Sequence, residues 1–131
     1  MKVIVVEDDE ALLEVISECI TLHFPETEVV LFKNADDAWQ HIANAGGEIK
    51  LIISDINMPG KMNGLDLLRE VKKIRSEIFF VSSSGLKRNL VAAKALGANE
   101  ILQKPFSFLN IQEIIKKSGG GTAFETTPGP C

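Results

Sequence analysis

The strongest constraint on the fold of this chain is a strict alternation of short apolar runs with longer segments of helical periodicity. Five runs of four or five residues alternate with five stretches in which apolar residues recur every three or four positions. Four of the runs are apolar almost throughout, which favours strands that are covered on both faces in a parallel sheet. The runs are Val3–Val6, Val29–Phe32, Leu51–Ser54, Ile78–Ser82 and Glu100–Gln103.

The segments after these runs each carry one apolar helical face. The faces lie within residues 12–20, 35–42, 67–74, 86–93 and 111–115. Asn34 and Ser107 are expected to cap the second and fifth helices. A β-α repeat with short connections requires right-handed crossovers and helices on both faces of the sheet. We therefore predict an α/β fold of the doubly wound, flavodoxin-like (βα)5 type, with a five-stranded parallel sheet in the order 2-1-3-4-5.

Length and composition fit one globular domain followed by a tail. The chain has 131 residues, 45% of them hydrophobic, and we place the domain at residues 1–117. Gly, Thr and Pro dominate residues 118–131, which is typical of a flexible linker or an expression remnant. The net charge of −4 disfavours direct binding of nucleic acid, and no helix-turn-helix pattern follows residue 117. Without a signal-peptide pattern or an apolar run long enough to span a bilayer, a cytoplasmic protein with no membrane segment is expected.

Polar side chains collect at the carboxyl ends of the predicted strands, where ligands bind in open α/β sheets. The first strand ends in Glu7-Asp8-Asp9, the third in Asp55, the fourth in Ser82-Ser83-Ser84 and the fifth in Lys104. Carboxylates held close together repel unless a proton or a cation neutralises them, and an oxygen-only cluster with few ligands suits Mg²⁺. A carboxylate beside such an ion can accept a phosphoryl group, while a lysine and a hydroxyl bind its remaining oxygens. The strand ends therefore contain the groups that phosphoryl acceptance needs.

Each of these residues also has an ordinary structural explanation. Acidic residues after a strand favour the N-terminus of the next helix, and a single aspartate or serine often forms a turn or a cap. The combination is more specific than its parts, because all four sets of residues stand at the matching strand ends of one β-α repeat.

Taken together, these motifs resemble the receiver domain of response regulators in two-component signal transduction, over residues 1–117. The resemblance implies a phosphorelay module that takes a phosphoryl group from a histidine kinase or a histidine phosphotransfer protein and switches a surface read by a downstream protein partner. It implies no enzyme activity beyond self-phosphorylation and autodephosphorylation, and it allows a homodimer. The stretches that carry the resemblance are Val5-Val6-Glu7-Asp8-Asp9, Ser54-Asp55-Ile56-Asn57-Met58-Pro59-Gly60, Asn63-Gly64-Leu65, Gly97-Ala98 and Lys104-Pro105-Phe106.

The resemblance implies an acceptor and a metal site. Asp55 matches the phosphoacceptor, and Lys104 matches the lysine that pairs with the phosphoryl group. The Mg²⁺ ligands are matched by Asp8, Asp55 and the backbone carbonyl of Asn57, with Glu7 acting through water. The peptide bond that follows Lys104 is expected to be cis, as is usual in this family.

The resemblance also implies a switch, with one departure from the family pattern. Ser82 matches the hydroxyl switch residue, and Ser83 the small residue after it. Asn57 and Ser84 stand at positions that adjust the lifetime of the phosphoryl group in this family. Ile101 stands where the family usually has an aromatic switch residue. The coupling of this position to the Ser82 hydroxyl is therefore expected to differ from the family's aromatic–hydroxyl coupling.

Two other interpretations are open. A degenerate receiver would act only as a protein-binding scaffold. The missing aromatic residue leaves this interpretation open for the surface that a downstream partner would read. A phosphatase of the haloacid dehalogenase type uses a similar nucleophile, lysine and metal carboxylates. That family generally needs a second aspartate where this chain has Asn57, and it needs a substrate cap for which no chain is left.

Overall fold

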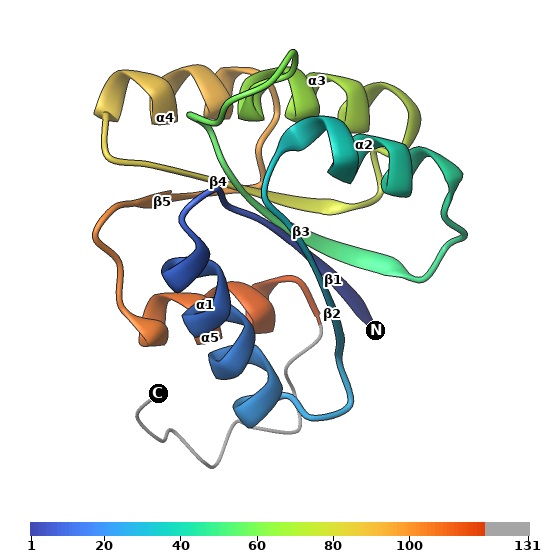
Figure 1. The fold of residues 1–131 in the computed structure, drawn as a ribbon, viewed down its shortest axis with the longest axis vertical. Helices are drawn as coiled ribbons and strands as arrows, with labels where there is room; N and C mark the ends of the chain where they lie inside the picture. Colours follow the sequence, from blue (N-terminus) through green and yellow to red (C-terminus); the bar gives the residue numbers. More distant parts are fainter. Residues whose placement is uncertain (120–131) are drawn as a thin grey trace.

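The computed structural model describes residues 1–119, in which five parallel strands form one sheet (Figure 1). Their order across the sheet is β2-β1-β3-β4-β5, and every neighbouring pair is parallel. The predicted fold class and the inferred strand order are both confirmed. The strands are β1 (Lys2–Val6), β2 (Glu28–Phe32), β3 (Ile49–Asp55), β4 (Phe79–Ser84) and β5 (Glu100–Gln103).

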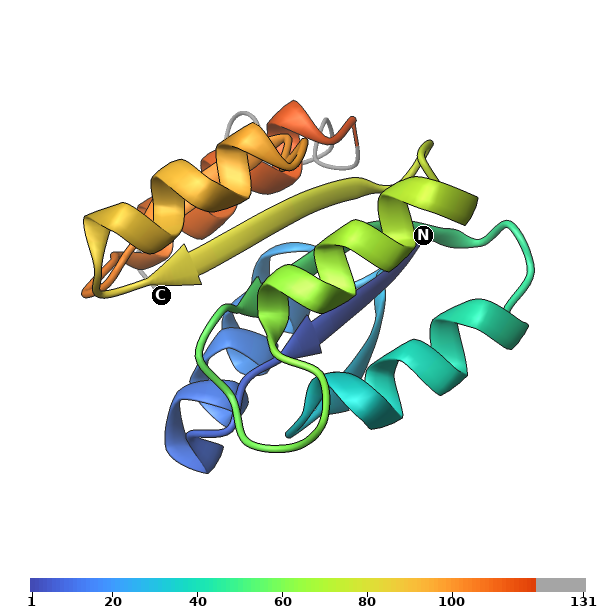
Figure 2. The ribbon, with the colours of Figure 1, turned by 90° about the horizontal axis from the view of Figure 1, so that it is seen from above.

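Helices cover both faces of the sheet, as Figures 1 and 2 show from two directions. One face is covered by α1 (Glu10–His23) and α5 (Phe108–Lys117). The other face is covered by α2 (Ala35–Asn44), α3 (Gly64–Ile74) and α4 (Lys87–Ala95). None of the helices in residues 1–119 combines the length and the apolar character that crossing a bilayer requires.

Side-chain alternation along the strands divides the core into two layers. Ile52 and Phe80 belong to the layer under α2, α3 and α4, whereas Ile53 and Val81 belong to the layer under α1 and α5. All four side chains are at most 2% exposed. Burial on both faces explains why these strands read as continuous apolar runs in the sequence.

Polar residues begin four of the helices. Asn34 and Ser107 each accept a hydrogen bond from the backbone N–H three residues further on, so both predicted N-caps are confirmed. Asp9 caps α1 in the same way, and Asn63 begins α3 in a reciprocal capping box with Asp66. These caps fix where each helix leaves the edge of the sheet that carries the strand ends.

Four of the five strands differ from the predicted runs by one or two residues at an end. β1 and β2 each begin one residue earlier than predicted, and β3 ends one residue later, at Asp55. β3 begins at Ile49, two residues earlier than predicted, because the exposed Lys50 interrupts the apolar run without ending the pairing with β1. β4 begins at Phe79 and continues to Ser84, whose carbonyl oxygen accepts a hydrogen bond from the N–H of Lys104. The tail predicted at residues 118–131 lies outside the described residues from residue 120 onward.

Arg75, which follows α3, holds the C-terminal end of α2. Its Nη1 donates to the carbonyl oxygens of Ile42 (3.2 Å) and Ala45 (3.1 Å), and its Nη2 donates to that of Gly46 (2.7 Å). The last carbonyl oxygens of a helix have no partner within the helix, so a guanidinium group that binds them fixes the helix end. One side chain therefore joins α2, the loop after it and α3.

We expect Arg75→Ala to lower the free energy of unfolding by about 2 kcal/mol, because three carbonyl oxygens lose a charged donor. Urea denaturation followed by circular dichroism measures this loss. Arg69→Ala is the control, since Arg69 pairs with Asp66 on the exposed surface of α3 and its loss should cost no more than about 0.5 kcal/mol. Equal losses in the two variants would contradict the bridging role of Arg75.

Candidate functional site

The carboxyl ends of three strands bring the predicted acidic and basic residues together. Glu7 and Asp8 directly follow β1, Asp55 is the last residue of β3, and Lys104 directly follows β5. One carboxylate oxygen from each of the three acidic residues lies within 4.8 Å of the others. Glu7 and Asp55 are only 2% and 6% exposed, whereas Asp8 is open to solvent. The structure thus forms an acidic cluster of Glu7, Asp8 and Asp55 that can hold a metal ion.

Lys104 lies between the two buried carboxylates of this acidic cluster. Its Nζ donates to Glu7 Oε1 at 2.8 Å and lies 3.2 Å from Asp55 Oδ2. Its backbone N–H donates to the carbonyl oxygen of Ser84 at 2.9 Å. The Lys104–Pro105 peptide bond is cis, as the resemblance implied. The ammonium group is therefore placed by the end of β5, next to the ends of β1, β3 and β4.

Each buried carboxylate uses its second oxygen to accept a backbone hydrogen bond. Glu7 Oε2 accepts from the N–H of Asp9 at 3.1 Å, and Asp55 Oδ1 accepts from the N–H of Ile56 at 2.9 Å. With Lys104 on the other oxygen of each group, both carboxylates are fixed in orientation.

Burial makes the acidic cluster costly in its fully ionised form. Burial raises the pKa of Asp55, and the ammonium group of Lys104 offsets only part of that shift. Burial also raises the pKa of Glu7, and the charge of Asp55 adds to this upward shift. Burial alone would lower the pKa of Lys104, but its hydrogen bond to Glu7 and the charge of Asp55 raise it above its ordinary value. The three carboxylates of the acidic cluster thus have one ammonium group, which contacts Glu7 and Asp55, and a second cation would relieve the remaining repulsion.

Two of the serines at the end of β4 are held beside the last residues of β3. Ser83 pairs in register with Asp55, and Ser82 pairs with Ser54. The Ser82 hydroxyl is fully buried and has no hydrogen-bond partner within residues 1–119. Buried hydroxyls are normally hydrogen-bonded, so the Ser82 hydroxyl has an unused capacity to donate a hydrogen bond.

Asn57 and Ser84, the two predicted lifetime positions, share a neighbour that the sequence did not reveal. Asn89 Nδ2 lies 3.4 Å from both Asn57 Oδ1 and Ser84 Oγ. Ser84 Oγ also accepts a hydrogen bond from the N–H of Leu86 at 3.1 Å. The sequence feature that could have indicated this contact is Asn89 itself, which lies in the first turn of α4. The N-cap residue of this helix makes no side-chain hydrogen bond. These contacts connect the start of α4 to the loop that follows β3.

The predicted switch position, Ile101, lies on the surface of β5 that faces α4. Its side chain is 37% exposed. It shares a hollow of about 270 Å³ with residues of α4 and β5, namely Lys87, Leu90, Val91 and Gln103. This surface lies across β4 from Asp55, and β5 also connects it to Lys104, three residues after Ile101.

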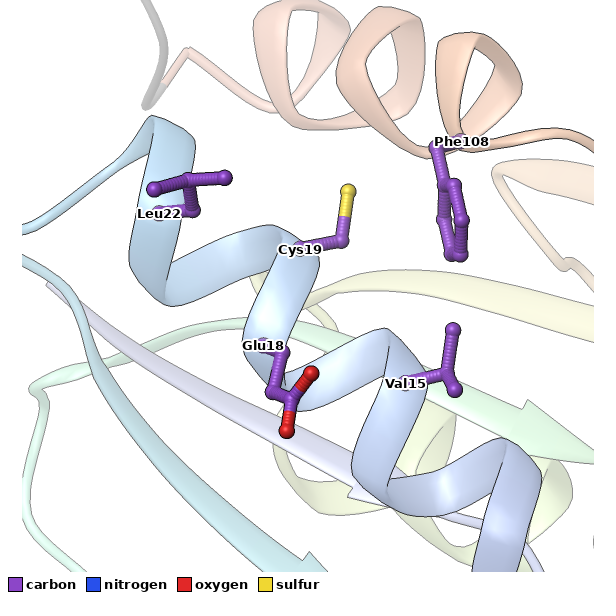
Figure 3. A pocket seen from close by; sticks show the side chains of 5 residues that line it. All are labelled: Val15, Glu18, Cys19, Leu22 and Phe108. Atoms are coloured by element: carbon purple, nitrogen blue, oxygen red, sulfur yellow. The ribbon is translucent and has the colours of Figure 1, made fainter. Parts of the chain in front are cut away.

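A second hollow, of about 190 Å³, lies between α1 and α5. Figure 3 shows four side chains of α1 and one of α5 around it: Val15, Glu18, Cys19, Leu22 and Phe108. No member of the acidic cluster lines this hollow or the one beside α4. Neither hollow is therefore part of the acidic cluster.

The comparisons with known proteins agree with this geometry. A family model described as the response regulator receiver domain matches residues 3–116. The chain is 32% identical over 114 residues to the chemotaxis protein CheY1 of Helicobacter pylori, which covers 82% of this chain and 87% of the relative. It is 31% identical over 118 residues to the DNA-binding transcriptional regulator NtrC of Azospirillum brasilense. That match covers 88% of this chain but 24% of the relative, so the chain spans about a quarter of that protein.

Solved structures with the same fold cover almost the same part of the chain. The response regulatory domain of protein mrkE from Klebsiella pneumoniae has a TM-score of 0.80 at 27% identity, covering 97% of this chain and 100% of that chain. A response regulator receiver domain protein from Clostridium thermocellum has a TM-score of 0.79 at 26% identity, with 89% and 92% covered. The matched residues include every strand end that contributes to the acidic cluster. The chain therefore belongs to the family of response regulator receiver domains of two-component signal transduction systems.

Proposed function

We propose that this chain is the phosphoacceptor module of a two-component phosphorelay. Asp55 takes up the phosphoryl group from a phosphohistidine on a histidine kinase or a histidine phosphotransfer protein. The observation that carries this proposal is the position of Lys104 Nζ, within 3.2 Å of carboxylate oxygens of both Glu7 and Asp55. A nucleophile, a cation and metal-binding oxygens then lie at one edge of the sheet.

The acidic cluster fits a resident Mg²⁺ ion. Its donors are all oxygens, and a divalent cation relieves the burial and repulsion that raise the pKa values of Glu7 and Asp55. We assign Asp8, Asp55 and the backbone carbonyl of Asn57 as direct ligands, with Glu7 acting through water. When bound, the ion neutralises charge on the phosphoryl oxygens.

The side chains at the strand ends carry the transfer itself. An oxygen of Asp55 forms a bond to phosphorus while the phosphorus–nitrogen bond of the donor breaks and its electron pair returns to the imidazole. Lys104 orients Asp55 and neutralises one phosphoryl oxygen, and the buried Ser82 hydroxyl donates to another. Ser83 pairs in register with Asp55, which supports a place for it beside the phosphoryl group. Positioning and charge neutralisation thus account for the reaction.

The output surface of the module consists of α4 and β5. When Ser82 moves toward the phosphoryl group, the end of β4 moves with it, and Ser84 transmits this motion through its hydrogen bond to Leu86 at the start of α4. A downstream protein partner reads the change, and Ile101 contributes an aliphatic contact there instead of an aromatic one. A homodimer is compatible with the same surface.

The proposed module occupies residues 1–117, and it acts in the cytoplasm. It has no catalytic turnover beyond the gain and loss of its own phosphoryl group. Neither a membrane segment nor direct contact with nucleic acid is part of this function. A phosphatase of the haloacid dehalogenase type is not favoured, because Asn57 stands where that family uses an acid–base aspartate.

Intact-mass spectrometry after incubation with acetyl phosphate tests the proposal. We expect a gain of one phosphoryl group in Mg²⁺, and a gain at least about tenfold slower once EDTA has removed the metal ion. A folded protein that gains nothing in Mg²⁺ would support the alternative of a scaffold without acceptor chemistry. A gain that is as fast in EDTA would contradict the assigned metal ligands.

A further inference from the structure

The loop between β3 and α3 carries one of the proposed metal ligands. This loop, residues 57–63, begins with Asn57, whose backbone carbonyl is assigned to the ion. At the base of the loop, the N–H of Gly64 donates to the carbonyl oxygen of Ile56 at 2.8 Å. This hydrogen bond joins only the two ends of the loop, so the middle of the loop must be held by contacts with other parts of the chain.

The tip of the loop is held by Asp36, in the first turn of α2. Asp36 Oδ2 accepts hydrogen bonds from the N–H groups of Lys61 at 3.1 Å and Met62 at 3.3 Å. Gly60 has a φ of 114°, and a side chain there would collide with the same carboxylate. Figure 2 shows the loop beside the N-terminal end of α2. The loop is therefore wrapped around one carboxylate that lies 25 residues earlier in the chain.

We propose that Asp36 is a positioning residue for the Mg²⁺ site, because it holds the tip of the loop that presents the Asn57 carbonyl. The identity of the ion rests on the proposed function. A loop fixed only at its base samples more conformations, and a ligand on such a loop binds only from the competent fraction of them. A charged acceptor for two backbone N–H groups raises that fraction more than a neutral one would.

Two measurements test this role, one in the metal-free protein and one with metal. The first is amide hydrogen exchange at Lys61 and Met62. The second is the Mg²⁺ concentration that gives half the maximal rate of phosphoryl gain from acetyl phosphate. For Asp36→Ala we expect about tenfold faster exchange and about a tenfold higher half-saturating Mg²⁺ concentration, because the competent fraction falls. The rate at saturating Mg²⁺ should stay within about twofold, since Asp55 and Lys104 are unchanged.

Two further variants distinguish the effect of the hydrogen bonds that Asp36 accepts from the effect of its negative charge. Asp36→Asn keeps an oxygen that can accept both N–H groups, so it should stay within about threefold of the wild-type chain in both measurements. Asp37→Ala removes the same charge from the same helical turn, where Asp37 contacts Asn34 and not the loop, and it should behave as the wild-type chain. If Asp36→Ala does not fold, Asp36→Glu takes its place in the comparison. The longer side chain displaces the acceptor oxygens by one methylene.

Asp36→Ala with wild-type exchange and wild-type Mg²⁺ dependence would overturn the inference. An equal rise of the half-saturating Mg²⁺ concentration in Asp36→Ala and Asp37→Ala would also overturn the inference. The negative charge at the start of α2, and not the hydrogen bonds from Asp36 to the loop, would then be responsible. A wild-type chain that gains no phosphoryl group would refute the proposed function separately. In that case the exchange rates at Lys61 and Met62 still decide whether Asp36 holds the loop.

Discussion

Asp55→Asn is expected to gain no phosphoryl group from acetyl phosphate and Mg²⁺, and yet to be more stable than the wild-type chain in metal-free buffer at neutral pH. The amide cannot act as the carboxylate nucleophile, so intact-mass spectrometry should show no gain. The higher stability has a separate cause. Burial raises the pKa of Asp55, so its ionised form destabilises the fold in spite of Lys104. A neutral side chain of the same shape should raise the free energy of unfolding by on the order of 1 kcal/mol.

This difference in stability should disappear in acid. A carboxyl group whose pKa is raised in the folded state contributes stability below its unfolded value, near about 4, and loses it as the pH rises through the folded value. The wild-type chain therefore loses stability relative to Asp55→Asn as the pH rises above about 4, and urea denaturation across this range measures the loss. Added Mg²⁺ should narrow the difference, because the ion stabilises the ionised acidic cluster.

Asp9→Asn is the matched control for Asp55→Asn. It also removes one negative charge beside the acidic cluster, while asparagine remains a good cap for α1. We expect Asp9→Asn to keep the Mg²⁺-dependent phosphoryl gain. If Asp55→Asn proves less stable than the wild-type chain without metal at neutral pH, the ion pair with Lys104 outweighs the cost of burial. Phosphoryl gain that persists in Asp55→Asn would place the acceptor elsewhere.

The acidic cluster could be predicted from the sequence because the fold itself aligns its parts. Parallel strands end at one edge of the sheet, so residues that follow different strands become neighbours once the β-α alternation is recognised. Glu7 and Lys104 are 97 residues apart, and their side chains are nevertheless 2.8 Å apart. Only the strand count and the approximate strand ends had to be correct for this prediction, and errors of one or two residues at the strand bounds did not affect it.

Contacts between loops could not be predicted in the same way. Asp36 reads as an ordinary acidic residue in the first turn of a helix, and its contact with Lys61 depends on the path of a loop. Arg75 and Asn89 likewise act on loops or helix ends that are 29 to 33 residues away in sequence. Hydrophobic periodicity describes which face of an element is buried, and it contains no information about where an exposed loop turns back.

Gly64→Ala is expected to lower the free energy of unfolding by about 3 kcal/mol or more, the larger of the two stability losses predicted for this chain. Gly64 is the buried first residue of α3 and packs against the end of β3. A Cβ atom at this position would overlap the backbone carbonyl oxygen of Asp55 and the Cα of Ile56. These are backbone atoms, so relief of the overlap has to displace the end of β3 instead of rotating a side chain.

The matched control is Gly47→Ala, because a Cβ atom at Gly47 would meet no atom within 4 Å. Its effect on the free energy of unfolding should not exceed about 0.5 kcal/mol in the same urea denaturation experiment. Phosphoryl gain should also slow in the folded fraction of Gly64→Ala, since the displaced backbone carries Asp55. If Gly64→Ala were as stable as Gly47→Ala, the junction of β3 and α3 would open at little cost. That junction could then not serve as the rigid base of the loop whose tip Asp36 is proposed to hold.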